Sequence, residues 1–263
     1  MERVIEMERS VIPACDVPFD KFEEIVEATA DVEKICAYKV GFTLGYLESL
    51  PKVTKLVRDK TDKIVIFDHQ KAATDITFTA KQFMDVMEKA EVDAVILDPQ
   101  SGPAVQYDWT KEAQSRNLGV IIVTEMTHPR YLDGDFRQLT NKKGELVRDY
   151  TKIFKEELGI DRDIPGYQRK GSVRDKIEIA ARMGIQDYVM PGNKPDKIKL
   201  FKEWLAEFGV KDPGVYSPGL IRQGGNINEG AEAAGNRFHG IVGTAIYTAE
   251  NIREAATGLT SQI

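Results

Sequence analysis

The sequence predicts an α/β fold, a (β/α)8 or TIM barrel in a single domain. Eight short apolar runs alternate with amphipathic helical patterns along the chain, and apolar strands separated by helices pair in parallel with right-handed crossovers. The length of 263 residues also matches the roughly 250 that such barrels use. A doubly wound open sheet is the alternative. The number of units, and the polar residues that recur where the strands end, favour the barrel.

The expected strands are short apolar runs without a helical period. In chain order they cover residues 10–17, 35–42, 64–67, 94–99, 119–126, 187–191, 214–218 and 239–245. The run at 64–67 is mostly β-branched, which is typical of a strand buried on both faces. The expected helices cover residues 19–30, 44–59, 75–90, 104–116, 172–183, 194–208, 227–234 and 249–256.

One segment interrupts this alternation. Residues 127–171 are polar and charged, with a helix expected near 145–158. A connection of that length inside a compact domain is typical of a lid, an interface element or a partly disordered loop. We therefore expect one barrel domain over residues 1–263, with 130–171 as an inserted loop and helix after the fifth strand.

Composition excludes several classes of function. A net charge of −6 argues against a general nucleic-acid binder, although a local basic pocket for a phosphate remains possible. No run approaches the roughly 20 apolar residues of a membrane span, and residues 1–10 lack the apolar core of a signal peptide. Cys15 and Cys36 lie in apolar runs and are interpreted as reduced core residues of a cytoplasmic protein. The cysteines and histidines show no spacing typical of a metal site.

Ionisable residues gather where the third strand ends. Asp68, Lys71 and Asp75 follow the apolar run at 64–67, and ligands of parallel α/β barrels bind at this end of the strands. Lys39 lies inside the second strand, where lysine is rarely buried without a partner. Its natural partners are Asp68 and Asp75. An ordinary strand-to-helix loop with a helix cap, or a purely structural ion pair, is the alternative.

Six further segments stand in order along the chain. They are Cys15-Asp16-Val17, Tyr38-Lys39-Val40-Gly41, Asp75-Ile76-Thr77-Phe78-Thr79, Glu125-Met126-Thr127-His128-Pro129, Ser217-Pro218-Gly219 with Gln223-Gly224-Gly225, and Ile241-Val242-Gly243-Thr244-Ala245-Ile246-Tyr247. Together these segments resemble the orotidine 5′-monophosphate decarboxylase family. Each segment is weak evidence alone, but six in order over nearly the whole chain are specific. The resemblance implies a cofactor-free barrel carboxy-lyase that acts on a phosphorylated nucleotide as a homodimer.

The resemblance also implies roles for individual residues. Lys39, Asp68, Lys71 and Asp75 would be catalytic. Asp16 would contact the ribose of the substrate, and Thr127 would contact the pyrimidine. The other substrate-binding residues would be Thr79, Pro218, Arg222, Gln223, Gly224, Gly225, Gly243 and Thr244. In this reading Lys71 stabilises a carbanion at C6 of the pyrimidine and then protonates it. Asp68 lies against the substrate carboxylate, and Asp75 enters from the partner subunit.

Two features depart from the family pattern. The family spacing Asp-x-Lys-x-x-Asp is one residue longer in each gap here, and Thr244 stands where the family usually has a phosphate-binding arginine. Arg222, next to Gln223, could supply the missing charge. These departures keep two alternatives open. One is a metal-dependent sugar-phosphate enzyme of the hexulose-phosphate synthase type, and the other is a phospholigand-binding barrel without catalysis.

Overall fold

Eight parallel strands form a closed barrel in the order β1-β10-β9-β8-β5-β4-β3-β2. The computed structural model describes residues 2–68, 75–141 and 143–263. The strands are β1 (Arg9–Cys15), β2 (Ala37–Val40), β3 (Ile64–Asp68), β4 (Ala94–Leu97), β5 (Gly119–Val123), β8 (Asp187–Val189), β9 (Gly214–Ser217) and β10 (Phe238–Val242). The predicted barrel is thus confirmed, and the open-sheet alternative is wrong.

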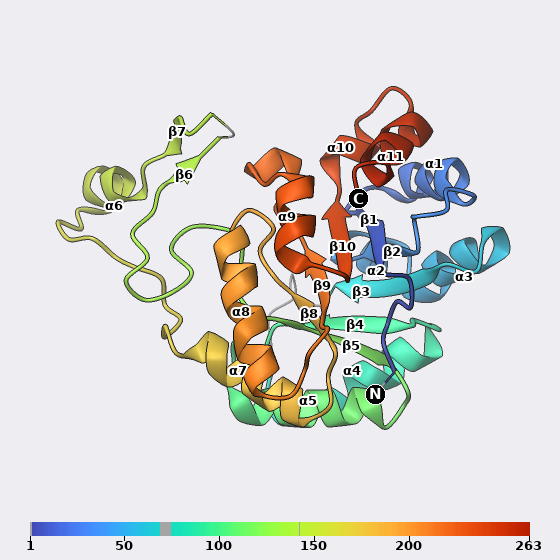
Figure 1. Ribbon diagram of the computed structural model, residues 1–263, viewed down its shortest axis with the longest axis horizontal. Helices are drawn as coiled ribbons and strands as arrows, with labels where there is room; N and C mark the ends of the chain where they lie inside the picture. Colours follow the sequence, from blue (N-terminus) through green and yellow to red (C-terminus); the bar gives the residue numbers. More distant parts are fainter. Residues whose placement is uncertain (1, 69–74, 142) are drawn as a thin grey trace.

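Helices pack around the outside of the barrel (Figure 1). They are α1 (Phe19–Thr29), α2 (Phe42–Leu47), α3 (Leu50–Lys60), α4 (Ala80–Lys89), α5 (Pro103–Gln114), α7 (Ser172–Arg182), α8 (Pro195–Glu207), α9 (Ile227–Ala234), α10 (Thr244–Tyr247) and α11 (Ile252–Thr260), with short 3-10 turns η2 (Thr77–Thr79) and η3 (Ile221–Gln223). None of the described helices is long and apolar enough to cross a membrane.

Alternation along the strands builds two apolar layers. Ile12 of β1 belongs to the cluster inside the barrel, together with Ile66 and Ile121, whereas its neighbour Val11 belongs to the layer between barrel and helices. This follows from the two-residue period of a strand, which sends successive side chains to opposite faces. Both faces are therefore apolar, and the ionisable groups of the strands are confined to the two ends of the barrel.

The helix expected at 44–59 is divided in two. Ser49 has a φ of 75° and separates α2 from α3, and Pro51 occupies the first turn of α3. A proline is tolerated there because the first amides of a helix have no partner within the helix. The last strand also ends earlier than expected, at Val242, because the chain turns at Gly243 and begins α10.

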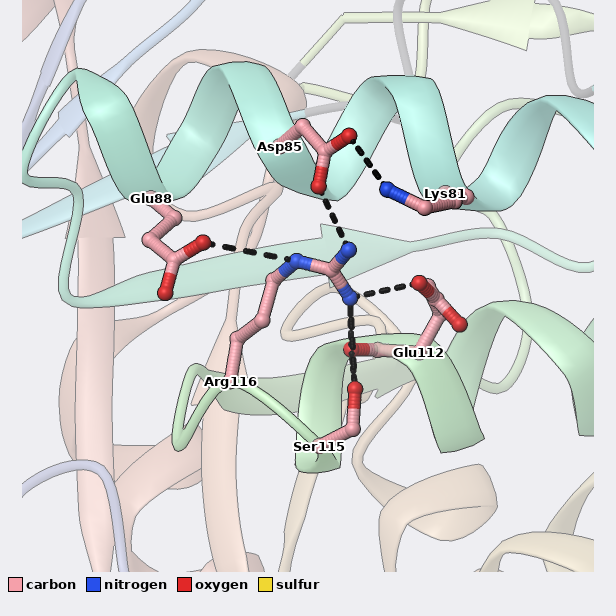
Figure 2. Close-up of polar contacts among 6 residues, drawn as sticks. All are labelled: Lys81, Asp85, Glu88, Glu112, Ser115 and Arg116. Atoms are coloured by element: carbon pink, nitrogen blue, oxygen red, sulfur yellow. Dashed lines mark hydrogen bonds and ion pairs between the residues drawn. The ribbon is translucent and has the colours of Figure 1, made fainter.

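An arginine joins α4 to α5 on the outer surface. Arg116 contacts Asp85 and Glu88 of α4 at 2.5 and 3.6 Å, and Glu112 of α5 at 2.6 Å (Figure 2). Hydrogen bonds from Lys81 and then Arg116 lower the pKa of Asp85 to about 2. These contacts hold α4 against α5, and α4 directly follows residues 75–79 in the chain.

The inserted segment forms a small unit of its own. It contains a hairpin of β6 (Leu139–Thr140) and β7 (Leu146–Arg148), followed by α6 (Tyr150–Leu158), and Figure 1 shows these elements standing to one side of the barrel. The helix expected near 145–158 therefore starts later, at Tyr150, where Asp149 caps it by accepting from the Lys152 amide. Arg130 holds the unit together by donating to the Ile164 carbonyl at 2.6 Å and to Thr151 at 2.7 Å.

Buried polar groups lie at the opposite end of the barrel from the strand carboxyl ends. Asp187 of β8 accepts a hydrogen bond from the Val4 amide at 3.0 Å, and the His239 ring bonds to Ser10 at 2.9 Å and contacts the ring of Tyr216. Burial raises the pKa of Asp187 to about 6 and lowers that of His239 to about 3. Both groups are therefore largely uncharged in the folded protein at mildly acidic pH.

These two groups should give opposing pH dependences of stability. Between about pH 4 and pH 6 the unfolded His239 binds a proton that the folded one lacks, so its contribution to the free energy of unfolding rises with pH. Asp187 does the reverse, because the folded carboxyl keeps a proton that the unfolded one releases. In Asp187→Asn only the histidine contribution remains. The difference in unfolding free energy, variant minus wild type, should rise with pH by up to about 1.4 kcal/mol per unit. Urea unfolding at several pH values measures it, and parallel curves would contradict the assignment.

Candidate active site

A buried charge cluster lies at the carboxyl ends of β1, β2 and β3. Lys39, with a side chain 4% exposed, donates a hydrogen bond to Asp68 and lies 3.8 Å from the carboxylate of Asp16. The register places these groups together, because Lys39 is opposite Ala14 of β1 and Ile66 of β3. Burial disfavours the ammonium, but Asp68 and Asp16 outweigh it and raise the pKa of Lys39. The site therefore holds a permanent ammonium between two carboxylates.

Asp75 lies apart from this cluster. Its carboxylate accepts a hydrogen bond from the Ile76 amide at 2.7 Å, and it is exposed. The Ile76 carbonyl in turn accepts from Thr79 at 2.8 Å and from Trp109 at 3.1 Å, which anchors residues 75–79 to α5. Within the chain Lys39 thus pairs with Asp68, as expected, but with Asp16 in place of Asp75. Lys71, the expected proton donor, lies outside the described residues.

A tight glycine turn follows β9. Gly219 and Gly224 have φ values of 86° and 90°, and the Gly225 amide donates to the Gly219 carbonyl at 3.1 Å. A Cβ at Gly225 would lie 2.6 Å from the Gly219 oxygen, so only glycine allows this approach. Pro218 and Gln223 belong to the same turn. Some turns of this kind present backbone amides to anions, but here the amides of Ile221, Arg222, Gly224 and Gly225 already donate to carbonyl oxygens within the turn.

Arg222 of this turn reaches the start of α10. Its guanidinium donates to the Thr244 hydroxyl at 3.1 Å, and that hydroxyl lies 3.0 Å from the phenol oxygen of Tyr247. Arg222 therefore brings its charge to the residue that replaces the family's arginine. Gly243 adjoins β1, since a Cβ there would lie 3.2 Å from the Ala14 carbonyl. Most of the predicted residues thus form an arc over five consecutive strands of the barrel, β9-β10-β1-β2-β3, whereas Thr127 follows β5 on the other side of the mouth.

Thr127 is held by residues that the sequence alone did not assign. The Thr127 carbonyl accepts from Asn193 at 3.2 Å, while Lys194 donates to Glu125 at 2.6 Å and to the Met126 carbonyl at 2.7 Å. Burial lowers the pKa of Lys194, although Glu125 opposes the shift. Asn193 and Glu125 are recognisable in sequence as polar residues at strand ends. Lys194 is not, because an ordinary first-turn lysine gives the same pattern.

A second buried pair fixes the root of the insertion. Lys176 of α7 lies 3.5 Å from the Asp98 carboxylate and donates to the Tyr131 hydroxyl at 2.9 Å. Burial lowers the pKa of Lys176. A sequence signal existed here, because Lys176 occupies the buried stripe of α7 between Val173 and Ala180.

Across the described ranges, no group of three or more histidine, cysteine or acidic side chains is arranged to hold a metal ion.

The Lys39–Asp68 pair should contribute to stability in a way that a double variant reveals. Lys39→Met removes the ammonium that pairs with Asp68 and leaves that carboxylate buried without its ion-pair partner. The free energy of unfolding should therefore fall by about 3–5 kcal/mol. Adding Asp68→Asn removes that charge and should restore part of the loss. Urea unfolding of the wild type, both single variants and the double variant measures the coupling. Strictly additive losses would contradict a tightly coupled pair.

Comparisons with known proteins agree with this geometry. A family model described as "Orotidine 5'-phosphate decarboxylase / HUMPS family" matches residues 9–259. The orotidine 5′-phosphate decarboxylase of Pyrococcus abyssi is 30% identical over 244 residues, which is 93% of each chain. That of Pyrococcus furiosus is 36% identical over 225 residues, 85% of this chain and 81% of the relative.

A solved structure extends the agreement to the fold. Orotidine 5′-monophosphate decarboxylase of Methanocaldococcus jannaschii, crystallised with the inhibitor BMP, superposes with a TM-score of 0.71 over 97% of this chain and 98% of its own, at 23% identity. At that identity the match supports the fold alone. The family model covers the strands that carry the arc of site residues, and the chain belongs to the orotidine 5′-phosphate decarboxylase / HUMPS family.

Proposed function

We propose that this protein is a carboxy-lyase that converts orotidine 5′-monophosphate to uridine 5′-monophosphate in pyrimidine biosynthesis. The observation that carries the proposal is the Asp16–Lys39–Asp68 cluster at the carboxyl end of the barrel, in which Lys39 and Asp68 are buried and Asp16 is partly exposed. It lies on one arc with the glycine turn and Arg222, so a nucleotide spanning the arc would have its base and its phosphate at opposite ends. Membership of the family supports the same reaction.

In the proposed reaction the bond between C6 and the carboxylate breaks, and its electron pair stays on C6. No ring carbonyl absorbs this charge directly, so a fixed ammonium beside C6 is needed to stabilise it. Lys71 is assigned that role, and it also delivers the proton that completes the product. Asp68 faces the leaving carboxylate, while Lys39 keeps Asp68 in place and, with Asp16, contacts the ribose.

We further propose that the protein works as a cytoplasmic homodimer in which Asp75 completes the partner's site. Three features support this. Asp75 is exposed and does not reach Lys39 of its own chain. The residues around it, Ile76 and Phe78, are 59% and 82% exposed, which is typical of a contact surface for another chain. Anchoring by Trp109 gives the segment a fixed position from which to project.

A decarboxylation assay tests the reaction and the role of Lys71 together. Orotidine monophosphate should be consumed in the presence of chelator, as followed by pyrimidine absorbance. Lys71→Ala should lose several powers of ten in turnover, each tenfold being about 1.4 kcal/mol in the barrier, while still binding uridine monophosphate. Lys55→Ala, an exposed lysine of α3, is the control and should keep full activity. Activity that disappears with chelator would favour a metal-dependent sugar-phosphate enzyme, and near-normal turnover in a folded Lys71→Ala would remove that residue from the mechanism.

The phosphate role of Arg222 is tested by comparing two ligands. Arg222→Ala should weaken inhibition by uridine monophosphate by on the order of 1.5–3 kcal/mol, the range for a lost charged hydrogen bond, and nearer the lower figure because Arg222 is exposed. Inhibition by uridine should change little. Thr244→Arg should be tolerated, because it restores a cation at the start of α10. Equal losses for both ligands would show that Arg222 does not contact the phosphate.

A further inference from the structure

The inserted hairpin lies beside the phosphate end of the proposed site. A cavity of about 440 Å³ is lined on one side by hairpin residues, Asn141, Lys143 and Glu145, and on the other by η3 and α10, through Arg222, Thr244 and their neighbours. The cavity is open to solvent, so a ligand bound there would stay partly exposed. In Figure 1 the hairpin reaches from the insertion back toward the side of the barrel that carries α9 and α10. Two segments about 80 residues apart thus form one cavity.

The two walls each supply a cation without an acidic partner. Among the described residues, the Lys143 ammonium has no hydrogen bond or ion pair, and the Arg222 guanidinium bonds only to the neutral hydroxyl of Thr244. Several other cations of the insertion are paired, such as Lys155 with Asp161 at 2.6 Å, although Arg148, Arg162 and Lys170 also have no ion pair among the described residues. In a chain of net charge −6, these two cations face a cavity whose lining carries a single carboxylate, that of Glu145, so its wall has an excess of positive charge.

The hairpin turn holds Lys143 at this position. The side-chain oxygen of Asn141 accepts from the amides of Lys143 and Glu145, at 2.9 and 3.0 Å, and its side-chain nitrogen donates to the Glu145 carboxylate at 2.7 Å. The one carboxylate on the cavity wall is therefore already engaged by Asn141. With the turn fixed by these bonds, Lys143 loses less freedom when it meets an anion than it would on an unstructured loop.

We propose that Lys143 is a second phosphate-binding residue and that the inserted hairpin closes the phosphate end of the site. The ligand is a phosphate monoester held between Lys143 and Arg222. This assignment rests on the proposed function for the identity of the nucleotide, but the anion site itself follows from the cavity and its charges. It gives the insertion a direct part in substrate recognition.

The test compares a phosphorylated ligand with its nucleoside. Lys143→Ala should weaken inhibition by uridine monophosphate about tenfold and raise KM for orotidine monophosphate, with inhibition by uridine unchanged. Lys143→Glu should weaken the nucleotide further. Because charge attraction is screened by salt, affinity of the wild type for uridine monophosphate should fall more steeply with ionic strength than that of Lys143→Ala. Lys152→Ala, which changes an exposed lysine of α6 in the same insertion, is the matched control and should behave as wild type.

A double variant identifies the shared ligand. If Lys143 and Arg222 hold one phosphate, the losses in Lys143→Ala and Arg222→Ala should not be additive in the double variant. Unchanged nucleotide inhibition in Lys143→Ala, or equal losses for nucleotide and nucleoside, would overturn the inference. Binding of inorganic phosphate, measured by calorimetry, separates it from the proposed function. Phosphate binding that depends on Lys143 supports the anion site even if the wild type fails to decarboxylate orotidine monophosphate, and binding that is independent of Lys143 refutes it.

Discussion

The barrel mouth is organised by the buried ion pair between Lys39 and Asp68. Removing two charges from water is expensive, and the attraction between them offsets that penalty only when the geometry is close. Closure of the barrel supplies the geometry, since β1, β2 and β3 are adjacent and Asp16 adds a second carboxylate beside the same ammonium. The excess of negative charge keeps Lys39 protonated, and with its position fixed it can orient a substrate without reorganising.

Two other buried lysines show what distinguishes this pair. Lys176 and Lys194 each face one main carboxylate, Asp98 and Glu125 respectively, and burial lowers the pKa of both. For Lys39 the attraction of Asp68 and Asp16 outweighs the effect of burial, and its pKa is raised. Lys176 also contacts Tyr131 of the insertion, and Lys194 contacts the Met126 carbonyl in the segment that leads into it. One side of the mouth therefore carries the proposed chemistry, and the other attaches the inserted segment to the barrel.

Features set by local sequence were predictable, and features set by tertiary packing were not. The strands and helices followed from periodicity, and the break at Ser49 was missed because no local pattern marks a positive φ in serine. Lys39 and Asp68 could be paired because a lysine in an apolar strand needs a partner. The burial of Lys176 was readable from the helix pattern, but its partner was not, since Lys176 reaches Asp98 across 78 positions of sequence. Lys143 could not be assigned, since it approaches η3 only through the folded insertion. Lys71 and the homodimer remain predictions.

The replacement of an arginine by Thr244 also has a physical consequence. A cation on the strand-to-helix junction would be fixed to the barrel, whereas Arg222 lies on η3, a short turn after β9. Among the described residues, the Arg222 guanidinium bonds only to the Thr244 hydroxyl. A phosphate bound there would draw together the glycine turn, α10 and the hairpin that bears Lys143. Binding energy from the phosphate, far from the reacting carbon, can then help to assemble the site around the pyrimidine. That energy raises the rate if the hairpin and turn close fully on the ligand only in the transition state. In place of one cation at position 244, this protein thus has Arg222 on η3 and Lys143 on the hairpin, and a bound phosphate could bring these two elements together.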